Sequence, residues 1–148
     1  SGLGDVYKRQ NLENATIRLE DLPSGTTFLR EDFFHSEWVD NPDPRVLDWG
    51  WQGSYRLAYL FDGMQIYALA GLYGTVEGAS RSVYEREEYR MENPPSLPWK
   101  RDSLSMVAVE GMGLGEPSVA FVEVLEHSDG TKNTITSVFF IRGYINLV

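Results

Sequence analysis

The segment from Ser54 to Gly74, "SYRLAYLFDGMQIYALAGLYG", constrains the fold more than any other part of the chain. Aromatic and apolar side chains take alternate positions in its first half: Tyr55, Leu57, Tyr59 and Phe61. This alternation predicts a β-strand. Asp62-Gly63 follows and predicts a tight hairpin, because these two residues adopt the positive φ angles that such turns require. The second half, residues 64–74, is apolar on both faces, which predicts a central strand covered on both sides.

Three further segments predict strands: "LSMVAVEG" (104–111), "SVAFVEVLEHS" (118–128) and "TITSVFFIRG" (134–143). Asp129-Gly130 predicts a second hairpin between the last two. The glycine-rich "GMGLGEP" between the first two has the spacing G-x-G-x-G, but a predicted strand follows it instead of a helix. A bound phosphate would have no helix N-terminus there, so we interpret this segment as a strand connection and expect no cofactor.

One long helix is predicted over residues 75–91. Thr75 is a suitable N-cap, and Glu77 is well placed in the first turn for the helix dipole. The helix ends before Pro94-Pro95. Together these elements predict an α+β fold, with one antiparallel sheet of about five or six strands and the long helix packed on one face.

Composition mainly excludes functions. The chain of 148 residues has a net charge of −9, which argues against nucleic acid and anionic membrane surfaces as partners. It has no cysteine, so thiol nucleophiles, thiolate metal sites and disulfides are excluded. No apolar run approaches the roughly 20 residues of a membrane helix, so we expect no membrane insertion.

The residues that suit acid–base or metal chemistry leave several alternatives open. Carboxylates crowd one segment: Glu31, Asp32, Glu37, Asp40, Asp43 and Asp48. They do not follow the calcium-loop spacing, and they are compatible with a solvated acidic face, a weak cation site or the acid pair of a small hydrolase. His35 and His127 lack metal-ligand spacing, although His35 is placed to pair with Glu37. We predict no catalytic residue and no metal site.

The most unusual stretch is "WGWQGSY" (49–55). With Trp38 nearby, Trp49, Trp51 and Tyr55 would form an aromatic platform for a sugar, another flat ligand or a partner protein. The same residues would serve equally well as core, because large aromatic side chains dominate protein interiors. The sequence is compatible with both an aromatic platform and a packed core.

The first ten residues, "SGLGDVYKRQ", differ from the rest of the chain. Asp5, Lys8 and Arg9 give them a charge of +1 in a chain of net charge −9. They resemble the translated linker at the start of fragmentary reading frames from environmental DNA, which implies a non-native segment at residues 1–10. The chain also stops in a predicted strand, "YINLV". We therefore expect residues 11–148 to be a single domain truncated at both ends.

The order of landmarks over residues 12–148 resembles bacterial extracytoplasmic α+β domains of lipoproteins and sensors, with PsbP-like or kinase-ectodomain-like architecture. The matching stretches are "LEDLPSG" (19–25), "GWQGSY" (50–55), "LYGTVEGAS" (72–80), "LGEPSVAF" (114–121) and "VFFIRGYINLV" (138–148). The resemblance implies a non-enzymatic binding or sensing module outside the cytoplasm, in the periplasm or at the cell surface. Two other functions stay open: a carboxylate-dependent hydrolase, and an assembly domain that pairs through a strand edge such as "YINLV".

Overall fold

The structure is a computed structural model that describes residues 12–13 and 15–141. The predictions for the first ten residues, for "YINLV" and for truncation at both ends lie outside these residues. The chain divides after Gly78 into two compact units. Helices are mixed with antiparallel sheets, which confirms the α+β class. The prediction of one sheet with five or six strands is wrong, because the described strands form two sheets of three.

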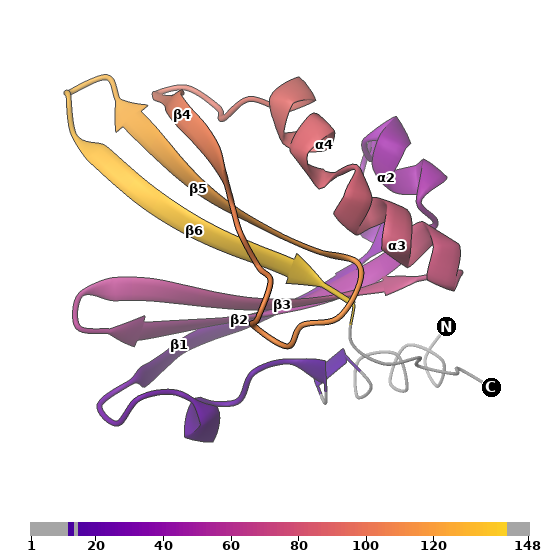
Figure 1. Cartoon of the computed structure of the whole chain (residues 1–148), viewed down its shortest axis with the longest axis horizontal. Helices are drawn as coiled ribbons and strands as arrows, with labels where there is room; N and C mark the ends of the chain where they lie inside the picture. The colour runs from indigo at the N-terminus through magenta and orange to yellow at the C-terminus, as the bar shows by residue number, and fades with distance from the viewer. Residues whose placement is uncertain (1–11, 14, 142–148) are drawn as a thin grey trace. The chain divides into compact units, whose positions relative to one another are not determined.

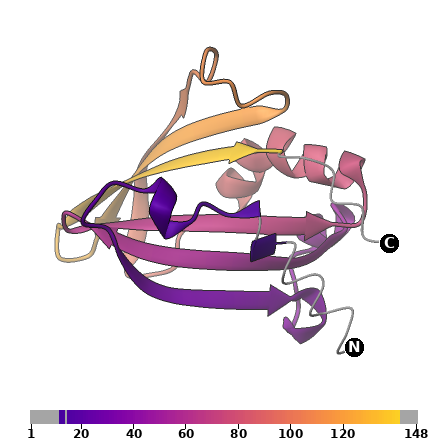
Figure 2. The ribbon, with the colours of Figure 1, turned by 90° about the horizontal axis from the view of Figure 1, so that it is seen from below.

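The first unit contains an antiparallel sheet of β1 (Thr27–His35), β2 (Trp51–Phe61) and β3 (Met64–Tyr73). The three strands run side by side in Figures 1 and 2. The predicted hairpin is confirmed: Phe61 pairs with Met64 across a turn in which Asp62 and Gly63 have φ angles of 47° and 75°.

The central strand of this sheet is β2, so the prediction of a central strand at residues 64–74 is wrong. Among the described strands, β2 is the one strand that pairs with β3, and the Tyr67 and Leu69 side chains of β3 are 51% and 60% exposed. Apolar content on both faces of β3 does not distinguish a central strand from an edge strand with one open face. Strand β1 is followed directly by the 3-10 turn η2 (Ser36–Trp38).

One face of the first sheet carries the core of the unit. Its buried members come from β2, β3 and the segment before β1: Leu12, Tyr55, Leu57, Tyr59, Ala68 and Leu72. The Tyr59 hydroxyl donates a hydrogen bond of 3.0 Å to the carbonyl oxygen of Ile17, two residues before the 3-10 turn η1 (Leu19–Asp21). The short helix α2 (Pro44–Asp48) begins at a proline, and the Asp43 carboxylate accepts the Arg45 N–H at 2.8 Å.

The predicted long helix is two helices, α3 (Val76–Tyr84) and α4 (Arg86–Glu92), so the prediction of one helix over residues 75–91 is wrong. The interruption lies at Glu85, where φ is −93° and ψ is 8°. Neither glycine nor proline marks this position, so the local sequence gave no signal for it. The predicted start is confirmed, since Thr75 Oγ1 accepts the Gly78 N–H at 3.0 Å.

The second unit contains an antiparallel sheet of β4 (Trp99–Val107), β5 (Ser118–His127) and β6 (Lys132–Phe140), with β5 in the centre. Asp129-Gly130 forms the predicted hairpin between β5 and β6. The glycine-rich segment connects β4 to β5, as predicted, and its three glycines have positive φ angles between 68° and 84°. Helix α4 contacts β5 and β6 through Arg90.

Candidate functional site

Trp38 is the most exposed of the predicted site residues, with 64% of its surface open to solvent. It ends the turn η2, in which the His35 side chain acts as the N-cap and accepts the Glu37 N–H at 3.2 Å. The indole ring meets Phe33 edge to face, with ring centres 5.9 Å apart, and lies 5.5 Å from the His35 ring. The indole is therefore exposed but held in place from two sides.

Tyr55 lies directly across from Phe33 in the β1–β2 register and is only 4% exposed. Its hydroxyl donates a hydrogen bond of 2.5 Å to Glu31 Oε2. The structure thus joins two predicted site residues, Tyr55 and Trp38, through Phe33. Tyr55 lies beside Phe33 in the sheet, and it is too deeply buried to contact a ligand itself.

Trp49 and Trp51 are both less exposed than Trp38. Trp49 is 1% exposed and is among the most deeply buried large side chains of the described chain. Trp51 is half-buried, and its Nε1–H donates to Ser54 Oγ at 2.8 Å. The aromatic surface available to a ligand is therefore centred on Trp38, while Trp49 is placed as core.

Four of the six carboxylates of residues 31–48 have separate local partners. Asp32 pairs with Arg56 at 2.7 Å, Asp43 caps α2, and Glu31 accepts the Tyr55 hydroxyl. Glu37 has a side chain that is 83% exposed, with its carboxylate 3.9 Å from His35 Nδ1. Among residues 12–13 and 15–141, no group of three or more acidic or histidine side chains is arranged to hold a metal ion. The hydrolase alternative stays a prediction.

The second unit contains an ion network that the sequence analysis missed. Glu123 on β5 has a side chain only 6% exposed, and its carboxylate accepts hydrogen bonds from Arg90 at 3.0 Å and Arg101 at 2.5 Å. Arg90 also donates to Ser137 Oγ at 3.2 Å. Burial lowers the pKa of Arg90 from its ordinary value, and Glu123 opposes that shift. A single glutamate inside the apolar strand "SVAFVEV" was the available signal.

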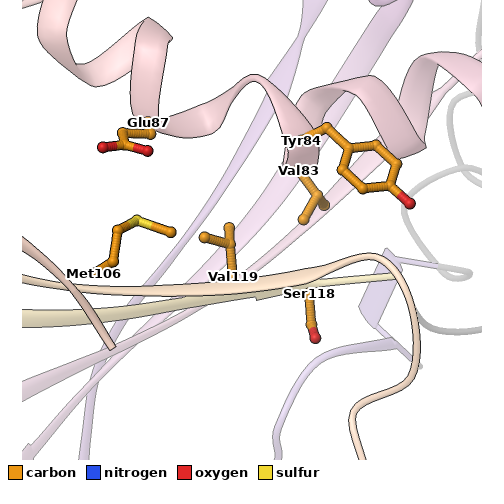
Figure 3. A pocket seen from close by; sticks show the side chains of 6 residues that line it. All are labelled: Val83, Tyr84, Glu87, Met106, Ser118 and Val119. Carbon is orange, nitrogen blue, oxygen red and sulfur yellow. The ribbon is translucent and has the colours of Figure 1, made fainter. Parts of the chain in front are cut away.

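A pocket lies in the second unit near the junction of the two helices (Figure 3). It has a volume of about 230 Å³ and is lined by Val83, Tyr84, Glu87, Met106, Ser118 and Val119. In Figure 3 the side chains of Val83, Met106 and Val119 point toward one another, whereas the Ser118 hydroxyl points away. Three of the six lining side chains are therefore apolar and face the same space.

Comparison with known proteins found no matching family model, no matching curated protein and no matching solved structure. The resemblance to extracytoplasmic lipoprotein and sensor domains stays a prediction. Within the described part of the chain, every helix is too short or too polar to cross a bilayer.

Proposed function

We propose that this chain is a non-enzymatic binding or sensing module whose contact surface is centred on Trp38 and whose ligand is a glycan. The observation that carries the proposal is the 64% exposure of an indole that Phe33 and His35 hold in place. Exposing a large aromatic ring to water has a free-energy cost, which contact with a ligand would remove. A ring already fixed by its neighbours also loses little conformational entropy on binding.

The polar groups beside Trp38 suit hydroxyl-rich ligands. Glu37 and Asp40 flank the exposed pair of Trp38 and Val39, and both are themselves exposed. Ionised carboxylates only accept hydrogen bonds, so they pair well with sugar hydroxyl groups. The negative charge of the chain disfavours polyanionic glycans. We therefore propose a neutral oligosaccharide as the ligand.

The proposed location is outside the cytoplasm. It rests on the resemblance of residues 12–148 to extracytoplasmic lipoprotein and sensor domains, where a glycan-binding module would meet cell-wall or environmental sugars. Fractionation of a bacterial host that expresses the full natural gene tests this point. Recovery in the periplasm or at the cell surface is expected, and recovery in the cytosol would contradict it.

The binding proposal is tested with an array of neutral and acidic oligosaccharides, followed by calorimetric titration of the best neutral sugar. Trp38→Ala is expected to weaken binding at least about tenfold, since central aromatic contacts often contribute 2 kcal/mol or more. Tyr67→Ala is the matched control, because Tyr67 is also an exposed aromatic residue (51%) but lies on the face of the sheet opposite to Phe33, the residue that Trp38 contacts. No neutral sugar bound, or equal losses in both variants, would overturn the proposal.

A further inference from the structure

The pocket of the second unit offers a site that is independent of Trp38. Its apolar walls come from three elements: Val83 of α3, Met106 of β4 and Val119 of β5 (Figure 3). Val83 is only 5% exposed and Met106 is 52% exposed, so the apolar lining includes both a buried and an accessible side chain. A small apolar ligand would bury its surface against all three side chains at once.

The size of the pocket limits what it accepts. A closed cavity of about 150 Å³ lined by apolar side chains accommodates benzene. The volume here, about 230 Å³, therefore fits one ring with a short substituent. Pockets for drug-sized ligands begin at about 300 Å³, so larger ligands would extend into solvent.

The charge of the lining selects among ligands of this size. Glu87 of α4 is the one lining residue that is charged at neutral pH, and it is exposed. The neighbouring cation, Arg86, is directed elsewhere: it donates to the Ser82 carbonyl at 2.9 Å, and its guanidinium lies over the Phe139 ring at 4.7 Å. Among the lining residues the one charge is thus the carboxylate of Glu87, which favours a cationic substituent beside it and repels a carboxylate.

From these three observations we propose that the pocket binds a small apolar ligand that carries a cationic nitrogen, with the ring or short chain against Val83, Met106 and Val119 and the nitrogen beside Glu87. The probes are benzylamine, benzyl alcohol and benzoate, which share one ring and differ in charge. A ligand of this size in a half-open pocket is expected to bind with a Kd on the order of 1 mM. Benzylamine is expected to bind about two- to fivefold more tightly than benzyl alcohol, since exposed ion pairs contribute little, and benzoate more weakly than both.

The experiment follows amide chemical shifts of the labelled protein during titration with each probe. Shifts are expected at the pocket residues. Glu87→Gln is expected to remove the preference for benzylamine while benzyl alcohol still binds, and Met106→Trp, which fills the pocket from its accessible side chain, is expected to abolish binding of both. Glu88→Gln is the matched control, because it removes the same charge from the next position on α4, outside the lining.

The proposal would be overturned if no chemical shifts changed at the pocket residues at about 20 mM probe, which is a twentyfold excess over the expected Kd. Equal affinity of the protein for all three probes would also overturn it. So would equal effects of Glu87→Gln and Glu88→Gln on the preference for benzylamine. Trp38 does not line this pocket, so the outcome of this experiment is independent of whether Trp38 binds a glycan.

Discussion

Gly78 packs directly against the main chain of Trp49: a Cβ added at position 78 would lie 1.9 Å from the Trp49 carbonyl oxygen. Gly78 is in the first turn of α3, and Trp49 is the C-cap residue of α2. This contact fixes the start of α3 against the residue that fills the interior of the first unit. The glycine is therefore required by close approach, since its φ angle is not in the left-handed region.

Gly78→Ala is expected to lower the free energy of unfolding by about 1–3 kcal/mol, because a backbone atom must move to admit the methyl group. Urea denaturation measures the change. Gly74→Ala is the control, since its added Cβ would meet the end of the Gln52 side chain at 3.2 Å, which is able to move. Alanine normally stabilises a helix relative to glycine, so a gain in stability for Gly78→Ala would show that the contact does not exist.

Trp49→Ala is expected to destabilise the protein by about 3–5 kcal/mol, because it leaves a large cavity at a position that is 1% exposed. Trp38→Ala should change stability by less than about 1 kcal/mol, since its ring is mostly in water already. Urea denaturation of both variants measures the two losses of stability and so distinguishes a core tryptophan from a surface tryptophan. Equal losses would mean that Trp38 is structural.

The carboxylate of Glu123 is expected to be essential to the second unit. Glu123→Ala removes the shared partner of Arg90 and Arg101 and leaves two poorly solvated cations, at a cost of about 3–5 kcal/mol. Denaturation of the second unit, followed by the signal of Trp99 on β4, measures it. Glu126→Ala on the same strand serves as the control and should cost much less. A mild effect of Glu123→Ala would show that the network is solvated.

Stability should fall in alkaline solution because of Tyr59. Burial raises the pKa of the Tyr59 hydroxyl above its ordinary value near 10, with a further contribution from Asp21. The folded state thus holds this proton more tightly than the unfolded state, so the stabilisation is present below pH 10 and is lost as the pH rises through the raised value. The ionised oxygen also has no proton to donate to Ile17.

Urea midpoints measured from pH 8 to pH 11 test this expectation. Tyr59→Phe is expected to flatten the decline above pH 10, and the control Tyr84→Phe, at a side chain that is 69% exposed, should leave it unchanged. The interpretation fails when the wild type and Tyr59→Phe decline in parallel.

The sequence predicted those parts of the fold that depend on neighbouring residues. Asp62-Gly63 between two alternating segments was sufficient for the β2–β3 hairpin, and the Thr75 hydroxyl was sufficient for the start of α3. The division into two sheets was not predictable in this way, because it depends on which strands pair over long distances. The interruption at Glu85 had no local signal either.

The candidate site was predictable only in part. The sequence pointed to four candidates, Trp38, Trp49, Trp51 and Tyr55, but it did not distinguish Trp38, which is 64% exposed, from Trp49, which is 1% exposed. Whether a tryptophan is buried depends on residues that pack against it from distant parts of the chain, which the local sequence does not reveal. Glu123 was not predicted either, because its two arginine partners lie on α4 and β4, far from it in the sequence.

The most direct test of the proposed glycan surface is ¹⁹F NMR of protein labelled with 5-fluorotryptophan. The chain has four tryptophans, so four signals are expected, each assigned by a Trp→Phe variant. When the best neutral oligosaccharide from the array is added, the Trp38 signal should shift in a saturable manner and the buried Trp49 signal should stay in place. A saturable shift of the other signals, with the Trp38 signal unchanged, would contradict the proposal that the glycan surface is centred on Trp38.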